Sequence, residues 1–387
     1  MMTHPLEAQA LMNAAQDATG LSDWGADVFR EPLDVLSSDL IEHADLNALG
    51  IERAKRRLVD NLKGRLALTE DRKRFPGIAD EVIDKPIFVA GLPRAGSTFF
   101  HNLLAADPVN RSPRMWEIMF PSPPPHEATY TTDPRIEECR DALAFEGFLS
   151  PAMQGIHPYG AERPEECNFL WEMSLLTVNY PAWWNVPNYA KLLYSVDMKP
   201  VYQEQKQALQ HLQHRFKRDR WVLKTPAHDW WMADLIDVFP DAGVVLCHRD
   251  PAKVLASLSN NLAVNYGLFS DVTPTGSFGM LDRQSQSMKR AADVRDAHPD
   301  QFFDAHYLQV QADPLKELRR CYERFGIAFD ESRAAAVQSW MDLDREAHAR
   351  GPKHAYTMEA FDLDYAGIDS VMGGYIRDFN VSLERAA

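Results

Sequence analysis

The sequence predicts an α/β fold in which a central parallel sheet is flanked by helices. Short, continuous apolar runs at residues 87–90 and 243–247 are typical of strands that are buried on both faces. Each run ends in a polar loop, and an amphipathic helical pattern follows it. Strand-to-helix units in succession indicate parallel strands joined by right-handed crossovers.

Composition limits the function classes. The chain has 387 residues and a net charge of −15, with 45% hydrophobic and 25% charged residues, which is ordinary for a globular protein. The acidity argues against a protein dedicated to nucleic acid or to anionic membrane surfaces, because such proteins usually carry a basic surface. One small anionic ligand needs only a few local cations and stays compatible with this charge.

Sequence features also suggest a location. No apolar run reaches the ~18 residues of a membrane-spanning helix, and the start of the chain lacks the pattern of a secretory signal. The four cysteines lie far apart, without the spacing of a zinc site or a disulfide framework. We therefore expect a cytoplasmic protein without a transmembrane segment and without a metal.

The chain changes character along its length. Residues 1–82 read as a helical N-terminal extension, with an amphipathic helix over residues 51–68. Residues 83–387 are expected to form one domain that carries an insert at about 121–218. This insert is rich in proline and aromatic residues, which predicts loops and short helices.

The later elements follow the same alternation. A strand at 221–223 is followed by a helix that is capped by Thr225, starts with Pro226 and stops before Pro240. After the strand at 243–247, the pair Asp250-Pro251 starts another helix. A last strand is expected at 306–310, before a helix over 314–325.

The loop after the first strand is a candidate anion site. It reads Gly-Leu-Pro-Arg-Ala-Gly-Ser-Thr from Gly91 to Thr98, and a helix is expected over 99–106. Glycines at both ends let backbone amides converge, and the helix N-terminus adds a partial positive charge. The pattern differs from the nucleoside-triphosphate loop at one position, because Ser97 replaces the lysine and Arg94 supplies a cation earlier.

A second anion site is indicated at the end of the 243–247 strand. Arg249 stands where a magnesium-binding aspartate would be expected, and Ser257 follows about two turns into the next helix. A guanidinium fork and a hydroxyl suit a second phosphate. The alternatives are an ion pair of Arg249 with Asp250 and a solvated position for Ser257. Two arginine-based sites favour an anion that is transferred without magnesium.

These motifs resemble those of the bacterial sulfotransferases, with similarity to the tyrosylprotein sulfotransferases. The resemblance runs in unbroken order over roughly residues 85–365. It rests on the loop at 93–98, Lys224-Thr225-Pro226, Arg249 with Ser257, Tyr307 before Ala312-Asp313-Pro314, and the segment 353–359. Many relatives carry Thr-Gly-Thr-Thr where this chain has Ala95-Gly96-Ser97-Thr98, so one hydroxyl is lost at Ala95.

The resemblance implies a three-layer fold like that of P-loop NTPases and the donor 3′-phosphoadenosine 5′-phosphosulfate (PAPS), which leaves as 3′,5′-bisphosphoadenosine (PAP). It places Arg94, Ala95, Gly96, Ser97 and Thr98 at the 5′-phosphosulfate, and Arg249 and Ser257 at the 3′-phosphate. Tyr307 is also expected at the donor. A lid at 351–361 would bring Lys353 and Tyr356 to phosphate.

Sulfuryl transfer to a hydroxyl needs cations for the developing charge and a base for the acceptor proton. Lys224, helped by Arg94, is the expected charge stabiliser. Glu117 is one candidate base, because tyrosylprotein sulfotransferases use a glutamate at the equivalent place, and it lies between apolar neighbours. It could instead pair with a nearby arginine. His157 is the other candidate base, because many cytosolic sulfotransferases use histidine.

The acceptor is expected to be a small-molecule or lipid hydroxyl, not a nucleic acid, and a homo-oligomer is compatible with the sequence. The aromatic residues of the insert either line the acceptor pocket or form the insert's own core; they are Trp171, Tyr180, Trp183, Trp184, Tyr189 and Tyr194. Two rival functions remain at this stage, a P-loop-type small-molecule kinase and a non-catalytic PAP-binding module.

Overall fold

The computed structural model describes residues 4–272, 280–348 and 358–385. The chain divides into two compact units, each assembled from three segments. Unit 1 comprises Met1–Ile83, Pro113–Lys217 and Leu262–Pro274, and unit 2 comprises Asp84–Ser112, Arg218–Asn261 and Thr275–Ala387. The expected division into an extension at 1–82 and one domain from residue 83 stays a prediction.

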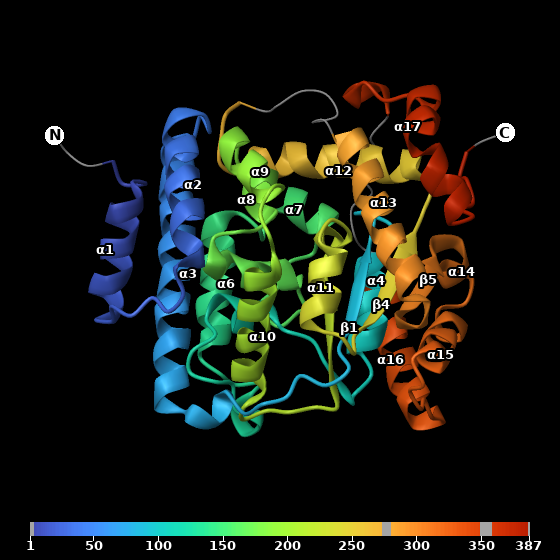
Figure 1. Cartoon of the computed structure of the whole chain (residues 1–387), viewed down its shortest axis with the longest axis horizontal. Coiled ribbons are helices and arrows are strands. Elements are labelled where there is room, and N and C mark those ends of the chain that lie inside the picture. The colour runs from blue at the N-terminus through green and yellow to red at the C-terminus, as the bar shows by residue number, and fades with distance from the viewer. Residues whose placement is uncertain (1–3, 273–279, 349–357, 386–387) are drawn as a thin grey trace. The chain divides into compact units, whose positions relative to one another are not determined.

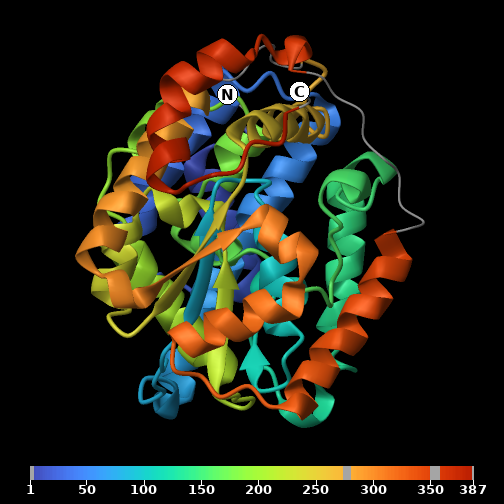
Figure 2. The same ribbon diagram turned by 90° about the vertical axis from the view of Figure 1, so that its right-hand side faces the viewer.

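Unit 2 is built on a parallel sheet. Within the described residues this sheet has five strands in the order β2-β3-β1-β4-β5. The strands are β1 (Ile87–Gly91), β2 (Asn110–Arg111), β3 (Arg220–Lys224), β4 (Gly243–His248) and β5 (Phe302–His306). Every residue of β1 and β4 is buried, as expected of central strands in a parallel sheet. Figure 1 shows β1, β4 and β5 next to one another, and Figure 2 shows the strands running side by side.

Helices pack on this sheet in two groups. In one group α4 contacts β1 and β3 and is joined by α15 and α16, and in the other η5, α11, α13 and α17 lie together. The helical segments of unit 2 are α4 (Ser97–Ala105), η5 (Pro226–Asp229), α11 (Met232–Val238), α13 (Met280–Ala297), η6 (Pro299–Gln301), α14 (Tyr307–Ala312), α15 (Pro314–Arg324), α16 (Glu331–His348), η7 (Glu359–Phe361) and α17 (Tyr365–Asp378). Helix α12 (Pro251–Tyr266) has residues in both units. The α/β fold with a central parallel sheet is thus confirmed.

One strand prediction is wrong. The expected strand at 306–310 lies four residues too late, because β5 ends at His306 and α14 begins at Tyr307. Phe302 and Phe303 are the residues that pair with β4, opposite Val244 and Val245. The expected single helix after Thr225 is also divided, into η5 and α11.

Unit 1 is helical in the part of the chain that the structure describes. Its first helices, α1 (Ala8–Thr19), α2 (Arg30–Glu42) and α3 (Ala48–Arg74), lie side by side (Figure 1). The other helical segments are η1 (Asp27–Phe29), η2 (Pro76–Ile78), α5 (Met115–Met119), η3 (Glu127–Thr129), α6 (Arg135–Glu146), α7 (Pro151–Ile156), η4 (Cys167–Ser174), α8 (Asn179–Trp183), α9 (Pro187–Leu193) and α10 (Lys199–Gln213). Among the described helices of the chain, none is both long enough and apolar enough to cross a membrane.

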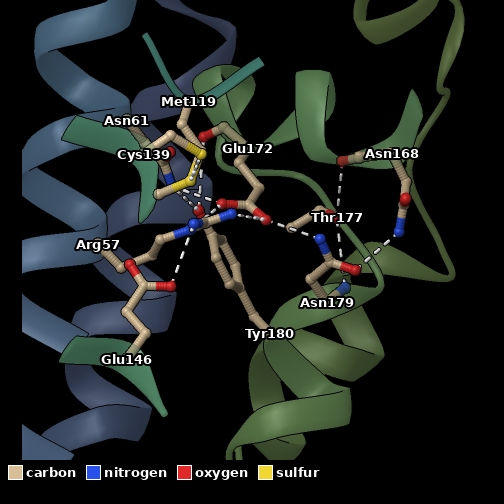
Figure 3. Close-up of polar contacts among 10 residues, drawn as sticks. All are labelled: Arg57, Asn61, Met119, Cys139, Glu146, Asn168, Glu172, Thr177, Asn179 and Tyr180. Atoms are coloured by element: carbon tan, nitrogen blue, oxygen red, sulfur yellow. Dashed lines mark hydrogen bonds and ion pairs between the residues drawn. The ribbon is translucent and has the colours of Figure 1, made fainter. Parts of the chain in front are cut away.

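A buried charge cluster holds three elements of unit 1 together. The guanidinium of Arg57, on α3, donates to both oxygens of Glu172 at 2.6 and 3.0 Å and to Glu146 at 3.2 Å (Figure 3). Asn61 and Asn179 also donate to Glu172, at 2.8 and 2.6 Å. Burial raises the pKa of Glu146 to about 7, although the charge of Arg57 opposes this rise. The cluster therefore couples α3 to α6 and η4.

The aromatic residues of the insert mostly form a core. Trp171, Tyr180, Trp183, Trp184 and Tyr189 are buried, whereas Tyr194 is half-buried. The ring of Tyr180 stacks on that of Trp184 at 5.2 Å and also contacts Trp183 and Tyr189. Of the two interpretations of these residues, the packing favours the core of unit 1 over an open acceptor pocket.

Candidate active site

The loop between β1 and α4 has a backbone that requires glycine at both ends. Gly91 and Gly96 have φ angles of 105° and 90°, in the left-handed region that favours glycine. A Cβ on Gly91 would lie 2.3 Å from the carbonyl oxygen of Cys247, and one on Gly96 would lie 3.0 Å from Cδ2 of Tyr307. Arg94 also has a positive φ, of 67°. The tight turn leads directly into the first turn of α4, whose free N–H groups suit an anion.

Asp229 holds the start of this loop and was not identified from the sequence. Its Oδ1 accepts the backbone N–H of Gly91 at 2.8 Å, and its side chain is fully buried. Burial raises the pKa of Asp229 to about 7, while the hydrogen bond from Gly91 lowers it. The one available signal was its position at the end of η5, five residues after Lys224.

Residues expected at two phosphates converge beside the loop. Nε of Arg94 donates to the hydroxyl of Ser257 at 3.1 Å, and Nη1 of Arg249 donates to the carbonyl oxygen of Arg94 at 3.3 Å. The guanidinium of Arg249 lies 3.8 Å from the centre of the Tyr307 ring, within the range of a cation–π contact. Unit 2 therefore brings Arg94, Gly96, Arg249, Ser257 and Tyr307 together.

The main ionic partner of Arg249 is a residue that the sequence did not indicate. Nε and Nη2 of Arg249 donate to the two carboxylate oxygens of Glu384, at 2.8 and 3.1 Å. Asp250, the partner considered from the sequence, instead accepts the backbone N–H groups of Ala252 and Glu384. The fork of Arg249 thus holds a bidentate anion.

Lys224 is the last residue of β3 and pairs with Val89 of β1. Val89 lies two residues before Gly91, where the loop begins. The side chain of Lys224 is 1% exposed. Burial and the nearby Asp229 carboxylate raise the pKa of the Cys247 thiol, and the charge of Lys224 opposes that rise. Ala95 and Ser97 are buried in the loop, whereas Thr98 is half-buried.

The two candidate bases belong to unit 1 and have different surroundings. The carboxylate of Glu117 is fully buried and accepts the N–H of Arg114 at 3.0 Å and the hydroxyl of Tyr130 at 2.6 Å, in a capping box at the start of α5. Nε2 of His157 lies 3.0 Å from both carboxylate oxygens of Glu165. The His157 side chain keeps 14% of its surface exposed. Lys353 and Tyr356 lie outside the described residues.

Comparison with known proteins agrees with this geometry. Residues 86–331 match the Sulfotransferase family. Over 269 residues the chain is 27% identical to the omega-hydroxy-beta-dihydromenaquinone-9 sulfotransferases Stf3 of Mycobacterium bovis and Mycobacterium tuberculosis. This match spans 65% of the chain and 65% of each relative, which is less than two thirds of their length.

Two solved structures are similar over nearly the whole chain. Sulfotransferase STF9 from Mycobacterium avium matches with a TM-score of 0.88 and 26% identity, and covers 98% of both chains. Sulfotransferase STF1 from Mycobacterium tuberculosis H37Rv matches with a TM-score of 0.83 and 29% identity, over 95% of this chain and 98% of that one.

Proposed function

The chain belongs to the sulfotransferase family, and from this premise we propose that it moves the sulfuryl group of PAPS to a hydroxyl of a small-molecule or lipid acceptor by in-line displacement, without a metal. The observation that carries the proposal is the convergence of Arg94, Ser257 and Arg249 beside the Gly91–Thr98 loop. This arrangement gathers, within one unit, donors that could hold the two anionic groups of one ligand.

The residues present fit the donor. The amides at the start of α4 and the side chain of Arg94 would hold its 5′-phosphosulfate, because both can donate to an anion. Arg249 and Ser257 would hold its 3′-phosphate. The contact with the Glu384 carboxylate shows that Nε and Nη2 of Arg249 can donate together to one anionic group. When bound, the donor supplies the activated sulfuryl group.

Lys224 would stabilise the charge that develops on the transferring and leaving oxygens. Its ammonium is buried at the end of β3, where surrounding protein excludes water and strengthens electrostatic stabilisation. Arg94 would assist from the loop. This arrangement assigns to side-chain cations the role that magnesium has in phosphoryl transfer.

His157 is the base that the surroundings favour. Glu165 fixes the orientation of its ring through Nε2, and the side chain keeps part of its surface exposed. Glu117 is the second candidate, but its carboxylate already accepts two hydrogen bonds and closes the N-terminus of α5. If Glu117 is the base, Glu117→Gln abolishes turnover and His157→Ala does not.

A lipid alcohol is the acceptor class to test first. The curated relatives are named for omega-hydroxy-beta-dihydromenaquinone-9, a hydroxylated menaquinone. We extend this chemistry to the present chain as a class and not as an identified substrate.

The test combines turnover with ligand binding. The purified protein is incubated with labelled PAPS and a lipid extract, and sulfated products are identified by mass spectrometry. We expect Lys224→Ala to lower kcat by about 10²–10³-fold, as removal of a transition-state donor does, while PAP binding is retained. If ATP with magnesium raises the melting temperature of the protein and PAP does not, a kinase function is favoured. If the protein binds PAP but sulfates no acceptor, a non-catalytic binding module is favoured.

A further inference from the structure

The guanidinium that the proposed function assigns to the 3′-phosphate is engaged by a carboxylate of the same chain. The two Glu384 oxygens lie 2.8 and 3.1 Å from Nε and Nη2 of Arg249. Both side chains are largely shielded, with 22% and 16% of their surfaces exposed for Arg249 and Glu384. A charge-assisted bidentate pair in such a position is stronger than a solvated surface pair.

Polar contacts of Glu384 and its neighbour Arg385 hold the carboxylate at Arg249 in this structure. The N–H of Glu384 donates to Oδ2 of Asp250 at 2.8 Å. The next residue, Arg385, donates to both oxygens of Asp369 at 2.7 and 2.6 Å and lies 3.5 Å from Asp250. The segment after α17 is therefore anchored on both sides of the carboxylate, and Asp250 ties it to the residue next to Arg249.

Three donor nitrogens of Arg249 are engaged by acceptors of the same chain. Nε and Nη2 donate to the carboxylate of Glu384, and Nη1 donates to the carbonyl oxygen of Arg94. Each edge of a guanidinium binds one bidentate anion at a time. Glu384 fills the Nε–Nη2 edge, and a phosphate on the neighbouring edge would meet the like charge of the carboxylate. We propose that Glu384 is an internal competitor of the donor's 3′-phosphate, so that donor binding displaces the segment that follows α17.

This inference rests on the proposed function, and titration calorimetry with PAP tests both separately. Glu384→Gln keeps the size of the side chain and removes its charge. We expect this variant to bind PAP about tenfold more tightly, because the competing charge-assisted pair is lost. Adenosine 5′-monophosphate lacks the 3′-phosphate, and its affinity should stay the same. The matched control is Glu323→Gln, an exposed position on α15, which should change neither affinity.

Hydrogen exchange on the unaltered protein gives an independent readout. Exchange at residues 379–385 should rise when PAP is added and stay unchanged with adenosine 5′-monophosphate. If Glu384→Gln binds PAP equally or more weakly, or exchange in this segment falls, Glu384 instead orients Arg249 and the competitor role is refuted. If neither protein binds PAP, the proposed donor site itself fails.

Discussion

Gly96→Ala is predicted to weaken donor binding through Tyr307. Gly96 has a φ of 90°, and an added Cβ would lie 3.0 Å from Cδ2 of the tyrosine ring. Since an ordinary contact is about 3.5–4.0 Å, the ring must move by roughly 0.5–1 Å. The Tyr307 ring supports the guanidinium of Arg249 at 3.8 Å. The substitution, made in the loop assigned to the 5′ group, therefore also reaches the proposed 3′-phosphate site through Tyr307 and Arg249.

The substitution Gly96→Ala should change two quantities, the free energy of unfolding and the affinity for PAP. An L-residue in the left-handed region costs about 1–2 kcal/mol, which should appear as a lower free energy of unfolding. The shift of Tyr307 and Arg249 should reduce PAP affinity by about tenfold, which corresponds to about 1.4 kcal/mol. Unfolding in urea measures the first quantity, and titration calorimetry with PAP measures the second.

The chain offers a matched control at Gly326. Its φ is 65°, and a Cβ there would meet no atom within 4 Å. Gly326→Ala should therefore lose comparable stability while PAP affinity stays within about twofold of the parent, because only backbone strain is introduced. In a Tyr307→Ala background, Gly96→Ala should cause no further loss of affinity. Unchanged PAP binding in Gly96→Ala would refute the proposed coupling through Tyr307.

Three further predictions concern other buried groups. Asp229 has a folded-state pKa of about 7 against an ordinary 3.8, so its contribution to stability falls as pH rises from about 4 to 7 and is level above that. The free energy of unfolding of Asp229→Asn, minus that of the parent protein, should therefore increase by about 2–4 kcal/mol from pH 4 to pH 7. A difference that does not change with pH would contradict the raised pKa of Asp229. Arg57→Met leaves the carboxylates of Glu146 and Glu172 buried without their counter-charge, so urea unfolding should show a loss of about 3–5 kcal/mol; the loss should shrink when both glutamates are changed to glutamine. Glu165→Gln removes the carboxylate that orients His157 and should lower kcat and alter its pH profile while PAP affinity is unchanged; an unaltered profile would exclude His157 as the base.

The fold could be predicted where one physical constraint dominates. Strands β1 and β4 are buried along their whole length, so their apolar runs identify them without periodicity. The end of β5 could not be placed, because apolar and aromatic residues continue across the junction from His306 to Tyr307 without glycine or proline. Helix α6 was also hidden, because charged residues interrupt its apolar pattern.

The residues of the proposed donor site could be predicted to lie together for topological reasons. Arg94 and Arg249 follow the carboxyl ends of adjacent parallel strands, β1 and β4, and such ends meet at one edge of a sheet. Glu384 could not be found in this way, because it reaches Arg249 across 135 positions of the chain from a segment without a motif. The role of Asp229 could not be predicted either, because the sequence alone does not distinguish a buried carboxylate from an exposed one.

The three-segment construction of each unit has a consequence for synthesis. The chain passes from one unit to the other five times between Ile83 and Thr275. Chains are synthesised at about 5–20 residues per second. The last segment of unit 1, which ends at Pro274, is therefore complete roughly 10–40 s after the first 83 residues have been made. Neither unit can be completed early in synthesis. If the chain is cut after residue 217, neither of the two fragments contains all the segments of either unit. We therefore expect this fold to form late in synthesis, with both units completed together and not one after the other.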